Sequence, residues 1–379
     1  MFEKKGFLFW PVGCGDSTTI VVDPKTIMQV DIRHLAACDA DDDDHAKIID
    51  QLIAHLPKKN NKPYLAAFVL THPDLDHILG FTDLLKAVTI GELWFTPRVF
   101  REYHKDLSDD ASAFKKEAER RVKVMINTGG AAAAGDRLRL IGYDELLAED
   151  EFKGFPKAFH TVPGHAVTMI DGVERAGDFR AFIHAPFKDD SAADRNETSV
   201  AMQVVLSDNP AAGGVLLFGD LSYPTIRRIF DETKAAGHME NLAWQVLLAP
   251  HHCSKSAMYQ PDGNGGQVLM KDILDDLDAA QVGDGYIVAS CETIPDTNEK
   301  GDNPPHARAK ARYEELAAGG FICTHEEGDD RSPLAFEAYD DGAIDYAGAL
   351  DTLAADPVAK AVDQARGGIA PPAEKVGFG

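Results

Sequence analysis

Short apolar runs of strand length alternate along the chain with polar turns and with stretches of helical spacing. Residues 65–70 form an uninterrupted apolar run, which is typical of a strand buried on both faces. Within residues 45–56 the apolar positions recur at helical spacing, and the polar, proline-flanked residues 57–63 end that helix. Helix followed by buried strand, after further short strands, predicts an α/β layered fold.

The remaining pattern predicts more strands and two further helices. We expect a charged helix from about residue 104 to 124 and another at residues 306–318. The other predicted strands are residues 7–9, 18–22, 26–32, 138–141, 179–183, 200–206, 215–218, 246–248, 287–289 and 321–324. We interpret residues 1–345 as one domain with a helical insertion at 104–127, and residues 346–379 as a C-terminal helix and flexible tail.

The chain is strongly acidic, which argues against broad nucleic-acid binding. Its 379 residues carry a formal net charge of −24 at pH 7, and we interpret the acidic run at residues 39–44 as a solvated loop. The five cysteines form no C-x-x-C pair and are expected to be free thiols of a reducing compartment. No apolar stretch approaches the ~18 residues of a membrane helix and no signal peptide is evident, so we expect a cytoplasmic protein without membrane contact.

Four potential metal ligands gather in the turn that follows the buried strand. His72, Asp74, Asp76 and His77 stand within six residues. Imidazole nitrogen and carboxylate oxygen are ligands for borderline and hard divalent ions, and α/β proteins place ligands at the carboxyl ends of strands. A polar loop with Asp76 capping the next helix would contain the same residues, so the choice depends on partners elsewhere.

Two later strands also end on residues of metal-binding type. Asp220 follows the strand at residues 215–218, and His251 and His252 follow the strand at residues 246–248. Three strand ends that present Asp or His groups favour a metal centre over three unrelated polar loops.

These ordered motifs resemble the metallo-β-lactamase superfamily, and within it the hydrolase domain of ComEC-type competence proteins. The matching motifs are Thr71-His72-Pro73-Asp74-Leu75-Asp76-His77-Ile78-Leu79-Gly80, Asn196-Glu197-Thr198-Ser199, Gly219-Asp220, Pro250-His251-His252-Cys253-Ser254 and His306. The resemblance covers about residues 7–336 and implies an α/β fold of the metallo-β-lactamase type, an αβ/βα four-layer sandwich of two mixed sheets with helices outside. It also implies a nuclease or phosphodiesterase that uses two divalent metal ions, zinc or manganese.

The resemblance further implies a set of metal ligands. These are His72 and Asp74 for one ion, Asp76, His77 and His251 for the other, and Asp220 as the bridge between them. Asn196 stands where the superfamily's middle histidine usually lies and is the implied ligand there. The alternative is His165 in a Pro-Gly-His sequence, although it stands 55 residues before Asp220 and such a histidine is more often structural. Oxygen ligands suit Mn²⁺ or Mg²⁺ better than Zn²⁺, so both zinc and manganese stay open.

Three residues near these motifs each allow two interpretations. Cys253 stands where the ComEC-type sequences prefer glycine, and its thiol is either a ligand or gate beside the metals or a tolerated side chain. Asp31 is either a partner that orients a ligand histidine or a turn residue at the end of its strand. His306 either takes part in catalysis or caps the helix that follows it.

A two-metal site of this kind would use a metal-bridged hydroxide, because two cations lower the pKa of a bridging water toward ~7. Asp76 is the candidate proton acceptor, and His252 and His306 are candidates for assisting the leaving group or holding a phosphate. We expect phosphodiester hydrolysis of a nucleic acid or nucleotide, although the net charge disfavours long duplex DNA. The basic residues within 115–123 would guide a phosphate backbone if their helix faced the metals; otherwise they form a solvated helix face.

Two alternatives to a phosphodiesterase remain. One is an amide, lactone or thioester hydrolase that uses the same metals. The other is a non-catalytic protein stabilised by metals, whose acidic surface docks a basic protein partner.

Overall fold

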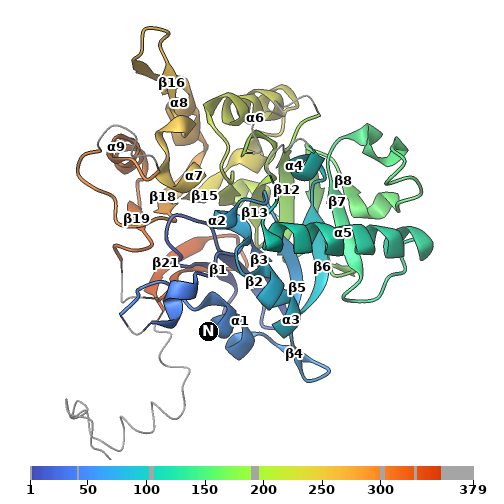
Figure 1. Cartoon of the computed structure of the whole chain (residues 1–379). Helices are drawn as coiled ribbons and strands as arrows, with labels where there is room; N and C mark the ends of the chain where they lie inside the picture. Colours follow the sequence, from blue (N-terminus) through green and yellow to red (C-terminus); the bar gives the residue numbers. More distant parts are fainter. Residues whose placement is uncertain are drawn as a thin grey trace, which may run out of the picture.

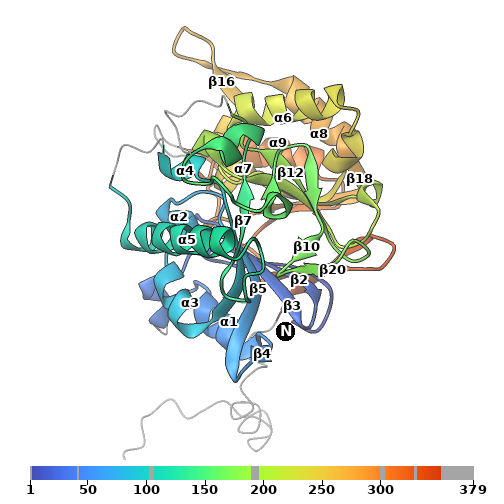
Figure 2. The ribbon, with the colours of Figure 1, turned by 90° about the vertical axis from the view of Figure 1, so that its right-hand side faces the viewer.

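Two large mixed β-sheets lie against each other, and helices cover their outer faces (Figure 1, Figure 2). The computed structural model describes residues 2–40, 42–101, 106–188, 196–298, 304–327 and 331–350. Among these residues no helix combines the length and the apolarity needed to cross a membrane.

The first sheet has ten strands in the order β21-β20-β1-β2-β3-β5-β6-β7-β8, with β4 paired to β5. Strands β3, β5, β6, β7 and β8 run parallel to one another, and β1, β2, β20 and β21 pair antiparallel. The bounds are β1 (Gly6–Phe9), β2 (Thr18–Asp23), β3 (Thr26–Val30), β4 (Lys58–Lys59), β5 (Lys62–Val69), β6 (Thr89–Phe95), β7 (Arg137–Ile141), β8 (His160–Thr161), β20 (Leu334–Ala338) and β21 (Ile344–Ala349).

The second sheet has seven strands in the order β19-β18-β15-β14-β13-β12-β9. Its strands β14, β15, β18 and β19 run parallel, so their carboxyl ends meet at one edge of the sheet. The bounds are β9 (His165–Val167), β12 (Arg180–Ala185), β13 (Ala201–Val205), β14 (Gly214–Leu217), β15 (Trp244–Leu248), β18 (Gln281–Ala289) and β19 (Gly320–Cys323). Two small hairpins pair β10 (Met169–Ile170) with β11 (Val173–Glu174) and β16 (Tyr259–Pro261) with β17 (Gln267–Leu269).

The helices divide between the two sheets in chain order. Those of the first half are α1 (Ile48–His55), α2 (Leu75–Ile78), α3 (Phe81–Ala87), α4 (Arg98–Arg101) and α5 (Asp109–Asn127). Those of the second half are α6 (Tyr223–Ala235), α7 (Pro250–Cys253), α8 (Lys271–Ala280) and α9 (Ala307–Leu316). Figure 2 shows α1, α3 and α5 near the first sheet and α6, α8 and α9 near the second.

Three buried apolar clusters separate the four layers. One joins the first sheet to its helices, as Phe68 and Phe114 illustrate. A second lies between the sheets and joins Val69 of β5 to Val215 of β14, and a third joins the second sheet to Ile229 of α6. Each sheet therefore buries both faces, which confirms the predicted αβ/βα four-layer sandwich.

The predicted elements agree with the structure in position but not always in extent. The apolar run at residues 65–70 lies in β5 and contributes to clusters on both sides of the sheet, as predicted. The helix predicted at about 104–124, within the predicted insertion at 104–127, is α5, which contributes Phe114 to the first cluster and so belongs to the outer layer; residues 102–105 lie outside the described residues.

The predicted domain end at residue 345 falls inside a strand. Strand β21 runs from Ile344 to Ala349 and pairs with β20, because its apolar residues continue the face of the first sheet. The domain therefore extends through β21. The predicted helix and tail beyond it fall on residues 351–379, outside the described residues.

Candidate metal centre

Three strand ends from the two sheets meet at one place. The loop with His72 and His77 follows β5 of the first sheet, Asp220 follows β14, and His251 and His252 follow β15. Two backbone hydrogen bonds hold these loops together: Val200 N–H donates to the Thr71 carbonyl at 3.1 Å, and His251 N–H donates to the Gly219 carbonyl at 3.0 Å. The spacing of polar residues in the sequence therefore corresponds to a real cluster.

Asp220 lies at the centre of the cluster, and its two carboxylate oxygens face different ligand sets. Oδ1 lies 3.1 Å from His77 Nε2 and 3.5 Å from His252 Nε2. Oδ2 lies 3.6 Å from both His72 Nε2 and His251 Nε2. Asp220 thus lies between two pairs of histidines, and its role as a bridge between two ions stays a prediction.

The acidic ligands complete the two sets. Asp76 Oδ2 lies 3.5 Å from His252 Nε2, on the Oδ1 side of Asp220. Asp74 Oδ2 lies 3.7 Å from His72 Nε2, on the Oδ2 side. Each side therefore offers two imidazole nitrogens and two carboxylate oxygens, with Asp220 shared.

This geometry corrects two assignments made from the sequence. His251 was predicted to complete the site of Asp76 and His77, yet it lies on the side of His72. His252 takes the predicted place of His251 beside Asp76 and Asp220. Because His252 is buried among these groups, its position suits a ligand better than the predicted role of assisting the leaving group. The sequence could not distinguish two adjacent histidines, because the backbone at their turn decides which ring faces which oxygen.

The donor set fits divalent cations. Asp220 Oδ1 is buried and accepts no hydrogen bond of normal geometry among the described residues. The Nε2 atoms of His77 and His252 lie 3.2 Å apart beside it, and Asp16, His77, Asp220 and His252 offer ligand atoms within 4.8 Å of one another. His72, Asp76 and His77 form a second such group, which joins residues from both sides of Asp220. Imidazole nitrogens and carboxylate oxygens that converge in this way are typical of zinc or manganese coordination.

Two further aspartates hold the ligand histidines from behind. Asp31 Oδ2 lies 2.8 Å from His77 Nδ1 and accepts a hydrogen bond from the Thr71 hydroxyl at 2.6 Å, while Oδ1 accepts one from Thr71 N–H at 2.8 Å. Nδ1–H of His77 therefore donates to Asp31 and leaves Nε2 to face Asp220. The predicted orienting role of Asp31 agrees with these contacts.

Asp16 lies behind His252 as an ion-pair partner, without a hydrogen bond of normal geometry, and sequence reasoning missed it. Its Oδ1 lies 3.3 Å from His252 Nδ1, and its backbone N–H donates to the Asp76 carbonyl at 3.0 Å. The signal in the sequence was the loop Gly13-Cys14-Gly15-Asp16, a glycine-rich turn between two strands that ends on a carboxylate.

The carboxylates control the charge of the buried ligands. Burial alone would lower the pKa of His252, but Asp220 and Asp16 outweigh it and raise that pKa to about 10. Burial likewise opposes charge on His77, yet Asp220 and Asp31 raise its pKa well above 6.5. Burial would raise the pKa of Asp220, but His77 and His252 hold it well below its usual range. In the absence of a metal the site therefore keeps protons on its histidines, and a cation must displace them.

The turn after β15 has an uncommon backbone conformation. His251, His252 and Cys253 have φ values of 51°, 51° and 64°, in the left-handed region. This explains why glycine suits position 253, and such strain is tolerated where the surroundings enforce it. The Cys253 thiol is buried in the cluster between the second sheet and its helices, so the structure places it in the core and not among the ligand groups.

The cluster opens onto a cleft of about 790 Å³. Its lining includes Asp74, Asp76, Asp220, His251, Asn196 and Arg33. Asn196 thus lies at the site, as predicted for the position of the middle ligand. His72, His77 and His252 are buried, whereas the side chains of Asp74, Asp76 and His251 are 26%, 33% and 24% exposed and accessible from the cleft.

His306 caps a helix. Its Nδ1 accepts a hydrogen bond from Arg308 N–H at 3.1 Å at the start of α9, and its backbone N–H donates to the Cys253 carbonyl at 3.1 Å. Of its two predicted roles, these contacts support the structural one, because His306 neither lines the cleft nor belongs to a ligand group among the described residues.

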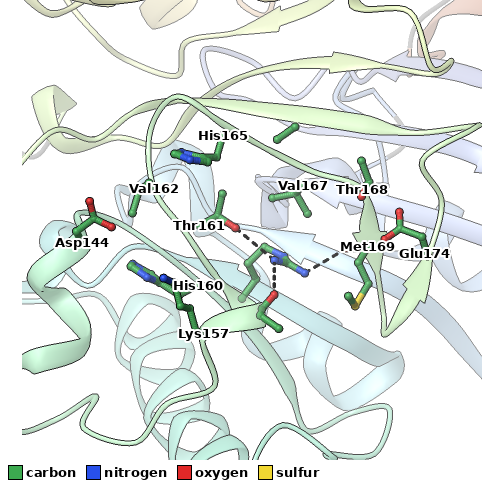
Figure 3. Close-up of a pocket in the computed structure, with 13 residues that line it drawn as sticks. Asp144, Lys157, His160, Thr161, Val162, His165, Val167, Thr168, Met169 and Glu174 are labelled. Carbon is green, nitrogen blue, oxygen red and sulfur yellow. Dashed lines mark hydrogen bonds between the residues drawn. The ribbon is translucent and has the colours of Figure 1, made fainter. Parts of the chain in front are cut away.

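His165 lies at a different cavity from the metal cluster. Figure 3 shows it with His160, Thr161 and Met169 around a pocket between β8 and β9. The Pro-Gly-His sequence therefore forms the turn into an edge strand of the second sheet, so the structure brings Asn196, and not His165, to the cleft.

No family model and no curated protein sequence matches this chain. Solved structures that are similar to it include the metallo-β-lactamase fold protein YhfI from Bacillus subtilis, at 12% identity and a TM-score of 0.43 over 87% of this chain and 100% of that one. Zn²⁺-bound PqqB from Methylobacterium extorquens is similar at 12% identity and a TM-score of 0.38, over 82% of this chain and 85% of that one. A diphosphatase from the PhnP family follows at 12% identity and a TM-score of 0.34, over 85% and 84%.

Similarities at TM-scores below 0.5 say nothing about the chemistry of the site, which rests on its own side chains. The narrower resemblance to ComEC-type proteins stays a prediction from the motifs.

Proposed function

We propose that this protein is a metal-dependent hydrolase that holds two divalent ions about Asp220 and cleaves phosphodiester bonds. The observation that carries the proposal is the division of ligands between the two oxygens of Asp220, with His72, Asp74 and His251 on one side and Asp76, His77 and His252 on the other. Bound divalent ions would supply a nucleophile from water at neutral pH and neutralise negative charge that develops on the substrate.

The accessibility of the site favours catalysis over a purely structural role. Structural metal sites are closed, whereas catalytic sites keep an open side toward the substrate. Here the buried histidines form the back of the site, and Asp74, Asp76 and His251 are accessible from the cleft. This arrangement counts against a non-catalytic protein that keeps metals only for stability.

The residues of the chain prepare the site in two ways. The hydrogen bond to Asp31 fixes the ring of His77, and Asp16 attracts Nδ1 of His252 from 3.3 Å, so both Nε2 atoms face Asp220. Burial would raise the pKa of Asp76, but His252 and His77 hold it below its usual range. Asp76 therefore remains a carboxylate, which suits a ligand better than the proton acceptor predicted for it.

The basic residues of α5 are not arranged to guide long duplex DNA to the metals, and this favours a small or single-stranded substrate. Arg121 is buried and donates to Glu117 and to backbone carbonyls, and Arg120 pairs with Glu117 and Asp136. Lys115 and Lys123 line a different cavity from the cleft. The helix therefore offers no continuous basic track to the metals, which leaves nucleotides or short single strands as the favoured substrates.

The test is a hydrolase screen of protein reconstituted with Zn²⁺ or Mn²⁺. Substrates are bis-p-nitrophenyl phosphate, single-stranded and duplex DNA, RNA, cyclic dinucleotides, and ester and lactam controls. We expect metal-dependent phosphodiester hydrolysis that Asp76→Ala reduces about 100-fold or more, and His165→Ala, which changes a distant pocket, leaves intact. Equal activity of wild type and Asp76→Ala, or activity only on the ester or lactam controls, would refute the proposal.

A further inference from the structure

Arg33 lies on a segment that is fixed to the ligand loop. Ile32 N–H donates to the His77 carbonyl at 2.9 Å, and His34 N–H donates to the Leu79 carbonyl at 2.8 Å. Ile32 is fully buried in the first apolar cluster, whereas Arg33 is half-buried. Arg33 accordingly lines the cleft together with Asp74, Asp76 and Asp220.

Two glycines make room for the Arg33 side chain. A Cβ on Gly15 would lie 2.3 Å from Arg33 Cδ, and a Cβ on Gly13 would lie 2.4 Å from Arg33 Nη1. Either methyl group would displace the side chain. Nη1–H also donates to the Val12 carbonyl at 2.7 Å, so the guanidinium is held in the loop that carries Asp16.

No carboxylate within the described parts of the chain pairs with Arg33 within 4.0 Å, although the protein has 62 acidic residues. Glu292 reaches the same loop, but its Oε1 bonds to His45 Nε2 at 2.9 Å. Among the described residues, the Arg33 guanidinium makes one hydrogen bond, to the Val12 carbonyl. Its other N–H groups are therefore available to donate to a ligand. Arg33 is held at the cleft and, in the part of the chain that the structure describes, has no paired carboxylate, although the protein is rich in acidic residues. Its guanidinium is therefore suited to bind an anionic group of a ligand.

We propose that Arg33 is the residue that selects an anionic phosphate ester, by donating hydrogen bonds to a non-bridging phosphate oxygen of the substrate. This inference rests on the proposed function, since it places the substrate in the cleft beside Asp220. It narrows the substrate class, because a neutral amide, ester or lactone gains little from the same guanidinium. Arg33 is then a specificity-determining residue beside the ligand set.

Binding of inorganic phosphate to metal-loaded protein tests this directly by calorimetry. We expect Arg33→Ala to raise the Kd for phosphate about 10- to 100-fold, the usual effect of losing a charge-assisted hydrogen bond. Arg33→Lys should fall between wild type and Arg33→Ala, because lysine keeps the charge but not the planar fork. Arg312→Ala is the matched control, since it removes one arginine of α9 that pairs with Glu315, and should leave the Kd unchanged.

A structural role of Arg33 predicts a different result. It would lower the bound-metal content and the melting temperature, and it would reduce hydrolysis of neutral p-nitrophenyl acetate as much as that of bis-p-nitrophenyl phosphate. We expect unchanged metal content, a raised KM for the phosphodiester alone, and little change on the acetate. A phosphate Kd of Arg33→Ala within twofold of wild type, or equal losses on both substrates, would overturn the inference.

The two proposals fail separately. If wild type cleaves bis-p-nitrophenyl phosphate and Arg33→Ala binds phosphate normally, only the role of Arg33 is refuted. If wild type cleaves no phosphodiester but binds phosphate, and Arg33→Ala does not bind it, the proposed function is refuted and the anion site at Arg33 stands.

Discussion

Two groups of histidines in this protein differ in the carboxylates around them. His77 and His252 lie beside Asp16, Asp31, Asp76 or Asp220, and their pKa values are raised although both rings are buried. Between the second sheet and α6, His184 of β12 bonds to the Asn241 carbonyl at 2.9 Å, and burial lowers its pKa to about 4.

The comparison shows that burial alone does not make a histidine a ligand. Both environments exclude water, but only the first supplies negative charge that matches a divalent cation. Burial also lowers the pKa of His160, at the pocket that His165 lines, although the charge of Asp144 opposes that shift. Close carboxylates are thus the feature that separates His77 and His252 from His184.

The largest effect should follow from removing the carboxylate that both sets share. Asp220→Ala should reduce the bound metal from two ions to one or fewer per chain. It should also lower kcat for the proposed reaction about 10³-fold or more, because each metal contributes several kcal/mol to the transition state. Elemental analysis of the purified protein and steady-state kinetics measure the two quantities.

His165→Ala is the matched control for Asp220→Ala, because it removes a candidate ligand from the other histidine group. Its metal content and kcat should stay within twofold of wild type. Loss of metal in this variant would contradict the separation of the two groups.

Neutralising the carboxylates behind the ligands should have a smaller effect. Asp31→Asn and Asp16→Asn should each weaken metal binding about 10- to 100-fold, the usual consequence of losing an orienting partner. Asp31→Asn should be the more severe, because Asp31 makes three short contacts of 2.6–2.8 Å whereas Asp16 lies 3.3 Å from His252. Asparagine also tolerates the φ of 53° at position 31.

Competition with a chromogenic chelator measures these affinities. His184→Gln, a change at a buried histidine that bonds to a backbone carbonyl, should not alter them. Equal affinities of wild type and Asp31→Asn would show that the orientation of His77 is set by packing alone.

The smallest expected effect is on the pH dependence of the free energy of unfolding, through His184 of the second group. The pKa of His184 is lowered from 6.5 to about 4, so the unfolded chain binds a proton before the folded protein does. The stability that depends on neutral His184 is complete above about pH 6.5 and is lost as the pH falls toward 4. Between pH 7.5 and 5 this amounts to about 2 kcal/mol of the free energy of unfolding.

Urea unfolding of wild type and His184→Gln at these two pH values measures the difference. The variant should lose about 2 kcal/mol less than wild type on acidification, because glutamine does not titrate and its amide N–H can still donate to Asn241. The same pH dependence in both proteins would show that another group causes the loss.

The sequence by itself determined the layered α/β fold and where the ligands stand along the chain. The apolar run of β5 predicts a strand buried on both faces, and the polar residues after β5, β14 and β15 mark the strand ends where ligands gather. These are local features, because hydrophobic periodicity and the residue that follows a strand depend on neighbours in the chain.

Only the tertiary structure decided how the ligands are divided and supported. The backbone turn at His251 and His252 assigns each ring to one oxygen of Asp220, and sheet pairing brings Asp16 and Arg33 beside loops more than forty residues away. Sheet pairing also extends the domain through β21, and it places His165 at a different pocket from the metal cluster. Such contacts join residues far apart in sequence, so they depend on how the two sheets pack and not on any local pattern.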